Sequence, residues 1–167
     1  MLIHGQFIRP DQVQALKSLG IFPSMFPMHT FYWGDWYKQI VGPEQAARIS
    51  PMRSILNTGL HATSHTDAPV ALPNLMQVVW ATVNRTSRSG DVIGPDERVT
   101  HYEAMKMITL WGAEQYGEQA AKGSIEAGKL ADLVVLSDNP ITMDPVKINQ
   151  VQVLETIKDG KTVWVRN

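Results

Sequence analysis

Short apolar runs alternate with amphipathic stretches through the first two thirds of the chain. Three of the runs are apolar enough to be buried strands, at residues 2–7, 21–26 and 60–64. Between the first two, apolar residues recur at the three-residue spacing of a helix that begins at Pro10 and stops at Gly20. This alternation predicts βα units and a parallel sheet.

Helix-end signals place three further helices in the same region. A Ser-Pro pair and a later Gly bound the first of them, and a capping box, Thr100 with Glu103, opens the third. The segment between the second and third helices is polar and is predicted to be a loop. The three helices are expected at residues 51–59, 74–83 and 100–117.

From about residue 118 the pattern changes to strands alone. Apolar runs occupy residues 133–136, 153–157 and 162–165. The last two flank Asp159-Gly160, a pair typical of a type I′ hairpin turn. A second, antiparallel sheet is therefore expected at the C-terminal end.

The polar residues with the clearest chemistry follow the 60–64 strand. Asp67 lies just beyond its C-terminal end, where α/β proteins keep their reactive groups, and His65 precedes it by two, so both side chains share one face of an extended chain. Such an Asp suits a metal ligand or a general base, although an Asp before Ala68-Pro69 is also a common turn residue.

Two motifs in this order, residues 63–70 and the segment 123–136 (GSIEAGKLADLVVL), resemble the C-terminal third of an amidohydrolase-superfamily enzyme, in the branch called amidohydrolase family 3 that contains the N-substituted formamide deformylases. Residues 2–6 (LIHGQ) look like that family's sixth barrel strand and residues 21–27 like its seventh. The resemblance implies an α/β fold made of the last three βα units of a (β/α)8 metal-dependent hydrolase barrel. These units would span residues 1–117, and residues 118–167 would form the C-terminal part of a small β-sandwich.

The resemblance also implies the chemistry: hydrolysis of a C–N bond in an N-acyl or N-formyl amide. Asp67 would bind a divalent metal, with zinc expected and one or two ions in the complete enzyme, and would move a proton from the attacking water to the leaving nitrogen. His4 would be a second metal ligand or would polarise the scissile carbonyl. His65 would orient the Asp67 carboxylate or touch the substrate.

An aromatic segment after the second strand resembles the family's substrate loop. Phe31 to Tyr37 holds five aromatic residues in seven positions. The small-molecule amide would contact His29, Phe31, Tyr32, Trp33 and Trp36 in this loop. The alternative is a buried hydrophobic flap. Other polar residues are expected to be structural: Arg85 and Arg88 on a solvated surface, His61 in buried packing or in the barrel interior, and His101 in the first turn of a helix.

The five histidines include no His-x-His pair, which the superfamily carries on its first barrel strand. The chain is therefore expected to be a fragment of a longer enzyme or a truncated reading frame, inactive without the N-terminal portion. The rival interpretation is a non-catalytic α/β interaction module that oligomerises to cover its open sheet edges.

Composition narrows the alternatives. Fifteen basic and 16 acidic residues give a formal net charge of −1, which argues against nucleic-acid or anionic-membrane binding. The absence of cysteine removes disulfides and thiolate metal sites. Without a long apolar run or a signal-peptide pattern, the expected location is cytoplasmic.

Overall fold

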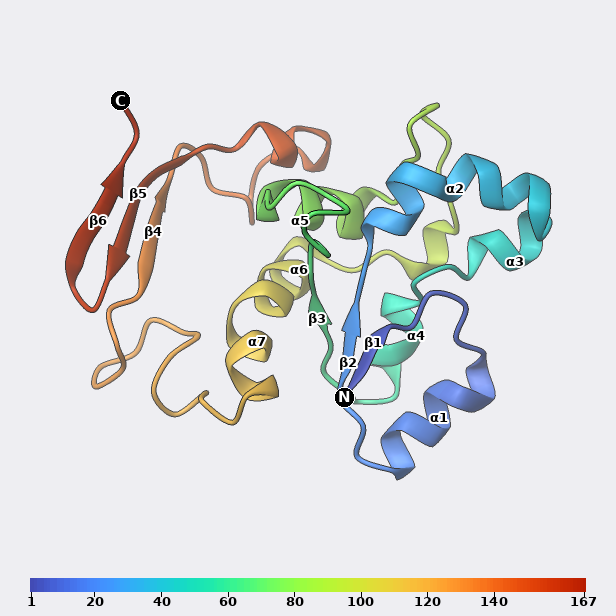
Figure 1. The fold of residues 1–167 in the computed structure, drawn as a ribbon, viewed down its shortest axis with the longest axis horizontal. Coiled ribbons are helices and arrows are strands. Elements are labelled where there is room, and N and C mark those ends of the chain that lie inside the picture. The colour runs from blue at the N-terminus through green and yellow to red at the C-terminus, as the bar shows by residue number, and fades with distance from the viewer.

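A three-stranded parallel sheet organises the first part of the chain in the computed structural model, which covers residues 1–167 (Figure 1). The strands β1 (Leu2–His4), β2 (Pro23–Met25) and β3 (Thr63–Ser64) lie in the order β1-β2-β3. The central strand β2 is buried along its whole length, as expected for a parallel sheet covered by helices. All three carboxyl ends therefore meet at one edge.

Helices surround this sheet and bury its central strand. Figure 1 shows α1 and α4 on the β1 side and α6 and α7 on the β3 side. A core of 20 buried residues joins β2 to α4 and α5. No helix is both long enough and apolar enough to cross a bilayer. The helices are α1 (Pro10–Ser18), α2 (Met28–Ile40), α3 (Pro43–Ala47), α4 (Met52–Asn57), α5 (Leu75–Asn84), the 3-10 turn η1 (Pro95–Glu97), α6 (His101–Ile108) and α7 (Leu110–Gln115).

A second, antiparallel sheet lies at the other end of the molecule, beyond α5, α6 and α7 (Figure 1). It contains β4 (Leu133–Leu136), β5 (Val153–Lys158) and β6 (Lys161–Val165), in that order. Positive φ angles at Asp159 (49°) and Gly160 (73°) bear out the predicted type I′ turn. A 3-10 helix, η2 (Pro145–Gln150), breaks the expected run of strands and packs against α5.

The strands of the parallel sheet are shorter than the apolar runs that predict them. The first run extends to residue 7, but β1 ends at His4, since His4 and Gly5 both have positive φ (69° and 55°) and turn the chain away from the sheet. This turn leaves the His4 side chain at the carboxyl edge of the sheet.

The aromatic segment is a helix, not the predicted loop. Residues 28–40 form α2, whose buried face carries His29, Thr30 and Gly34. A Cβ atom on Gly34 would lie 2.8 Å from Ile93 Cγ1, so this glycine allows the helix to approach Ile93 closely. The tight packing, which local sequence does not reveal, overrides the weak helix propensity of aromatic residues.

The predicted helix over 100–117 is two helices, α6 and α7, with the expected capping box at Thr100 and Glu103. Thr109 separates them with non-helical dihedrals (φ −129°, ψ −94°). Its hydroxyl donates to the Met105 carbonyl at 2.8 Å, a contact that bends helices.

Two expectations about polar residues are wrong. Arg85 is 1% exposed and lies inside the protein, whereas Arg88 is at the surface as predicted. His61 is not buried: its side chain is 44% exposed, stacks on Trp111 and pairs with Glu114 at 2.6 Å. Arg85 is buried because nearby carbonyl groups need donors, and His61 precedes β3 at the amino end of the sheet.

Candidate metal centre

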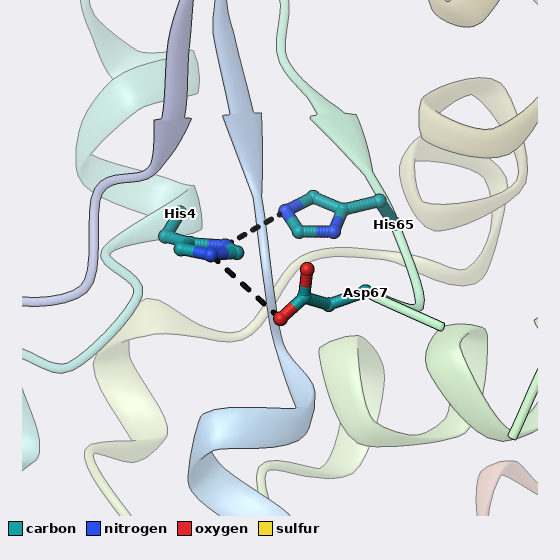
Figure 2. Close-up of side chains that lie close together, drawn as sticks. All are labelled: His4, His65 and Asp67. Atoms are coloured by element: carbon teal, nitrogen blue, oxygen red, sulfur yellow. Dashed lines mark hydrogen bonds and ion pairs between the residues drawn. The ribbon is translucent and has the colours of Figure 1, made fainter. Parts of the chain in front are cut away.

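Three polar side chains converge at the carboxyl edge of the parallel sheet. His4 ends β1, and His65 and Asp67 follow β3, so the groups come from the two strands that flank β2. Figure 2 shows all three pointing toward one another beyond the strand ends. One ligand atom from each lies within 4.8 Å of the others.

His4 stands at the centre of this cluster and contacts both partners. Its Nδ1 shares a hydrogen bond with His65 Nε2 at 3.2 Å, and its Nε2 lies 3.7 Å from Asp67 Oδ2. The side chains of His4 and Asp67 are 39% and 35% exposed. The cluster is therefore open to a small molecule from solvent.

The backbone holds two of the three residues in an unusual conformation. His4 and Asp67 have φ angles of 69° and 53°, in the left-handed region that non-glycine residues seldom adopt. Such strain persists only where the surroundings fix it, and it gathers at functional sites.

Phe26, directly after β2, forms an aromatic floor under the cluster. Its ring stacks on His65 (centroids 5.3 Å apart, 16° between planes) and meets His29 edge-on at 4.7 Å. It also lies 5.7 Å from His4. Phe26 is 1% exposed, and an apolar residue in an apolar run gives no sequence signal for this role.

The environment keeps two of the imidazoles neutral near pH 7. Burial, followed by the nearby His4 and His65 rings, lowers the pKa of His29 to about 4. Burial and His4 also lower the pKa of His65, partly opposed by Asp67. A neutral imidazole has a free lone pair and can bind a metal ion.

The residues expected at the substrate divide into two groups. His29 is 7% exposed and lies 5.7 Å from the His4 ring, and Trp33 lies one helical turn further on, 5.8 Å from His29. Tyr32 packs against Trp33 at 5.5 Å. Phe31 instead packs on Trp80 of α5, and Trp36 is 55% exposed, so the structure does not bring these two to the cluster.

The donor set fits a divalent ion of the zinc type. Two imidazoles and one carboxylate make up the three protein ligands that catalytic zinc sites have. Donor atoms around a tetrahedral ion with bonds of about 2 Å lie about 3.3 Å apart. The three donor atoms lie within 4.8 Å of one another, and the partly exposed side chains of His4 and Asp67 can rotate to close this spacing.

A parallel α/β sheet with such donors at its carboxyl edge is typical of metal-dependent hydrolases. The sequence model of a protein family described as 'Amidohydrolase family' matches residues 1–164. The chain belongs to this family.

Two curated relatives extend the comparison. An N-substituted formamide deformylase from Arthrobacter pascens is 33% identical over 160 residues, 95% of this chain and 30% of that protein. A putative amidohydrolase, YtcJ, from Bacillus subtilis is 22% identical over 99% of this chain and 32% of its own length. The chain thus spans about a third of the length of these relatives.

Solved structures agree on the fold. An E. coli guanine deaminase matches 99% of this chain and 39% of its own, with a TM-score of 0.71 and 17% identity. An adenosine deaminase from Xanthomonas campestris with bound zinc gives a TM-score of 0.70 at 17% identity, over 98% of this chain and 36% of its own. The fold of this chain therefore matches between a third and two fifths of each of these structures.

Proposed function

We propose that this chain supplies the carboxyl-edge metal ligands of a hydrolase that cleaves C–N bonds in N-acyl or N-formyl amides. The convergence of His4, His65 and Asp67 on one edge of the sheet carries the proposal. The relative described as an N-substituted formamide deformylase supports this substrate class.

In this proposal His4 and Asp67 hold the ion, and His65 lies beside both as an orienting group or a third donor. A divalent ion held there, with zinc expected, would supply Lewis-acid chemistry at the amide carbonyl. The Asp67 carboxylate takes a proton from the attacking water and delivers it to the leaving nitrogen, so that an amide and a water become an acid and an amine. His65 and His4 keep this carboxylate oriented.

The aromatic helix α2 would select the substrate. His29 and Trp33 face the cluster from consecutive turns, and Tyr32 packs beside them. This surface suits an apolar or aromatic substituent on the amide. Phe31 and Trp36 would contribute through the packing of α2 and not by direct contact.

Residues 1–117 correspond in this proposal to the last three βα units of a (β/α)8 barrel, and residues 118–167 to the C-terminal part of a β-sandwich. The remaining units and any further ligands would come from the missing N-terminal portion of the same enzyme. The complete protein would hold one or two ions.

The proposal predicts a weak but specific zinc site in the chain itself. Asp67→Asn and His4→Ala should each weaken zinc binding in calorimetric titrations by about 100-fold or more, since losing an outer partner of a metal ligand alone costs about 10–100-fold. His61→Gln is the matched control, because His61 pairs with a carboxylate at the opposite end of the sheet. Equal zinc affinity in all four proteins would disprove the site.

The same preparations test catalysis. With zinc present, release of amine from an aromatic N-substituted formamide should be no faster than in buffer, because in this proposal the complete active site needs further residues from outside this chain. Zinc-dependent turnover that Asp67→Asn abolishes would contradict this expectation and show that the chain builds a complete site.

A second candidate role is self-association through the C-terminal sheet. Val163 and Val165 of β6 are 61% and 55% exposed, and Val134 of β4 is 54% exposed. Exposed apolar surface of this kind is normally covered by association, here by a second copy of the chain.

Sedimentation at micromolar concentration tests this role. Wild type should sediment as a concentration-dependent oligomer, and Val163→Lys should shift it toward monomer because a lysine cannot be buried without a partner. Thr162→Lys adds the same charge at an exposed polar position and should leave the oligomer intact. A monomeric wild type with a sharp melt would refute self-association.

A further inference from the structure

Arg85 is a buried cation that the proposed chemistry does not use. It caps the C-terminal end of α5 and is 1% exposed. Its guanidinium donates only to backbone carbonyls: Nε to Ile93 at 2.7 Å, Nη1 to Ser50 at 3.0 Å, and Nη2 to Ile49 at 2.6 Å and Ala47 at 3.4 Å. Arg85 therefore connects Ile93 to residues 47–50, which run from the last residue of α3 toward the start of α4.

Close packing against Gly94 also fixes residues 47–50. A Cβ atom on Gly94 would lie 1.8 Å from the Ala47 carbonyl oxygen, so no other residue fits there without movement of the backbone. Residues 47–50 are thus held both by the arginine and by a glycine contact. A segment fixed in this way can act as a rigid support for its neighbours.

Ser50 carries this support to the carboxyl edge of the sheet. It is fully buried and has a φ of 47°. Its N–H donates to the Gln6 carbonyl at 2.8 Å, and its hydroxyl donates to the Phe26 carbonyl at 3.1 Å. Gln6 follows His4 by two residues, and Phe26 is the aromatic floor under the histidines.

We propose that Ser50, held in place by Arg85, is a positioning residue that sets the spacing between His4 and His65 through the Phe26 floor. The expected effect on metal binding rests on the proposed function. The contacts of Ser50 with Gln6 and Phe26 are independent of that function. Without the Ser50 hydroxyl, the Phe26 carbonyl keeps only the His29 N–H as a donor, at 3.2 Å, and the backbone that carries the Phe26 ring is held less tightly. The Ser50 N–H likewise anchors the turn in which His4 keeps its positive φ.

Ser50→Gly is the most direct test. Glycine keeps the N–H bond to Gln6 and adopts a φ of 47° without strain, so the variant removes the CH2OH side chain and leaves the backbone contact intact. Its zinc affinity in calorimetric titrations should fall by about 10-fold or more, within the range seen when outer partners of metal ligands are removed. Ser50→Ala removes the same hydroxyl while keeping a Cβ atom and serves as a second variant.

Thr82→Val is the matched control. Thr82 is 1% exposed, and its hydroxyl donates to the Val78 carbonyl at 2.8 Å within α5. Its loss should lower the melting temperature by a similar amount and leave zinc affinity unchanged. A purely structural role for Ser50 would instead lower stability alone, with zinc affinity equal to that of the control.

A metal-free measurement separates this inference from the proposed function. Nuclear Overhauser contacts between the ring protons of Phe26 and the imidazole of His65 should weaken in Ser50→Gly and persist in Thr82→Val. If wild type binds no zinc at His4 and Asp67, the proposed function fails, and these contacts still decide the positioning role. Unchanged contacts, or unfolding of both Ser50 variants while the control folds, would overturn it.

Discussion

Arg85→Met should destabilise the protein by about 3–5 kcal/mol, the largest effect we expect from a single substitution. Methionine approximates the aliphatic part of the arginine side chain but donates no hydrogen bond. The carbonyls of Ile49 and Ile93, each within 3.0 Å of the guanidinium, would then be buried without donors, and each such group costs about 1–3 kcal/mol. The relief of guanidinium burial offsets part of this cost.

Denaturant unfolding at pH 7 measures the effect, and Arg88→Met is the natural control. Arg88 lies three residues further on, at the surface, and its substitution should change stability by no more than about 0.5 kcal/mol. If the two variants unfolded at the same denaturant concentration, the network of carbonyls around Arg85 would not be a source of stability.

The second large effect is a loss of stability in acid through His29. Burial lowers its pKa in the folded protein to about 4, whereas an unfolded histidine titrates near its ordinary value of 6.5. Between these values the unfolded state binds more protons, so stability falls as the pH decreases from 6.5 to 4. A difference of this size corresponds to about 3 kcal/mol.

His29→Phe should remove this part of the pH dependence. The buried Nδ1 atom of His29 has no hydrogen-bond partner, so a phenyl ring loses no polar contact there. The unfolding free energy of both metal-free proteins is measured from about pH 7.5 to 4. Each curve is expressed as the change from its own value at about pH 7.5, so the difference between the two curves is the contribution of His29. Parallel curves would mean that His29 is protonated in the folded state as readily as in the unfolded one.

The sequence predicts the carboxyl-edge cluster from two kinds of signal. Asp67 lies just past the end of the 60–64 apolar run, whereas His4 lies inside the 2–7 run and is marked as a strand end by the family resemblance. Parallel strands bring such ends to one edge. The same logic predicts the Asp159-Gly160 hairpin, since type I′ turns require residues that tolerate positive φ. The hairpin depends on local chemistry alone.

Features that depend on distant partners escape such reasoning. The polar run around Arg85 is typical of a surface loop, and only the carbonyls of residues 47–50 explain why the arginine is buried. The aromatic run of α2 has no helical pattern in the sequence. The close approach of Gly34 to Ile93, which packs this helix against the protein, involves a residue far along the chain. Neither Ser50 nor Phe26 differs in type from an ordinary core residue.

The order of the strands determines when the side chains of His4, His65 and Asp67 come together during folding. His4 and His65 are 61 residues apart in sequence, and β2 lies between their strands. Their encounter requires the closure of a long loop and the pairing of all three strands, which are slow steps in folding compared with helix formation. A spectroscopically visible ion such as cobalt, added during refolding, would therefore report the completion of the sheet and time the last long-range event of folding.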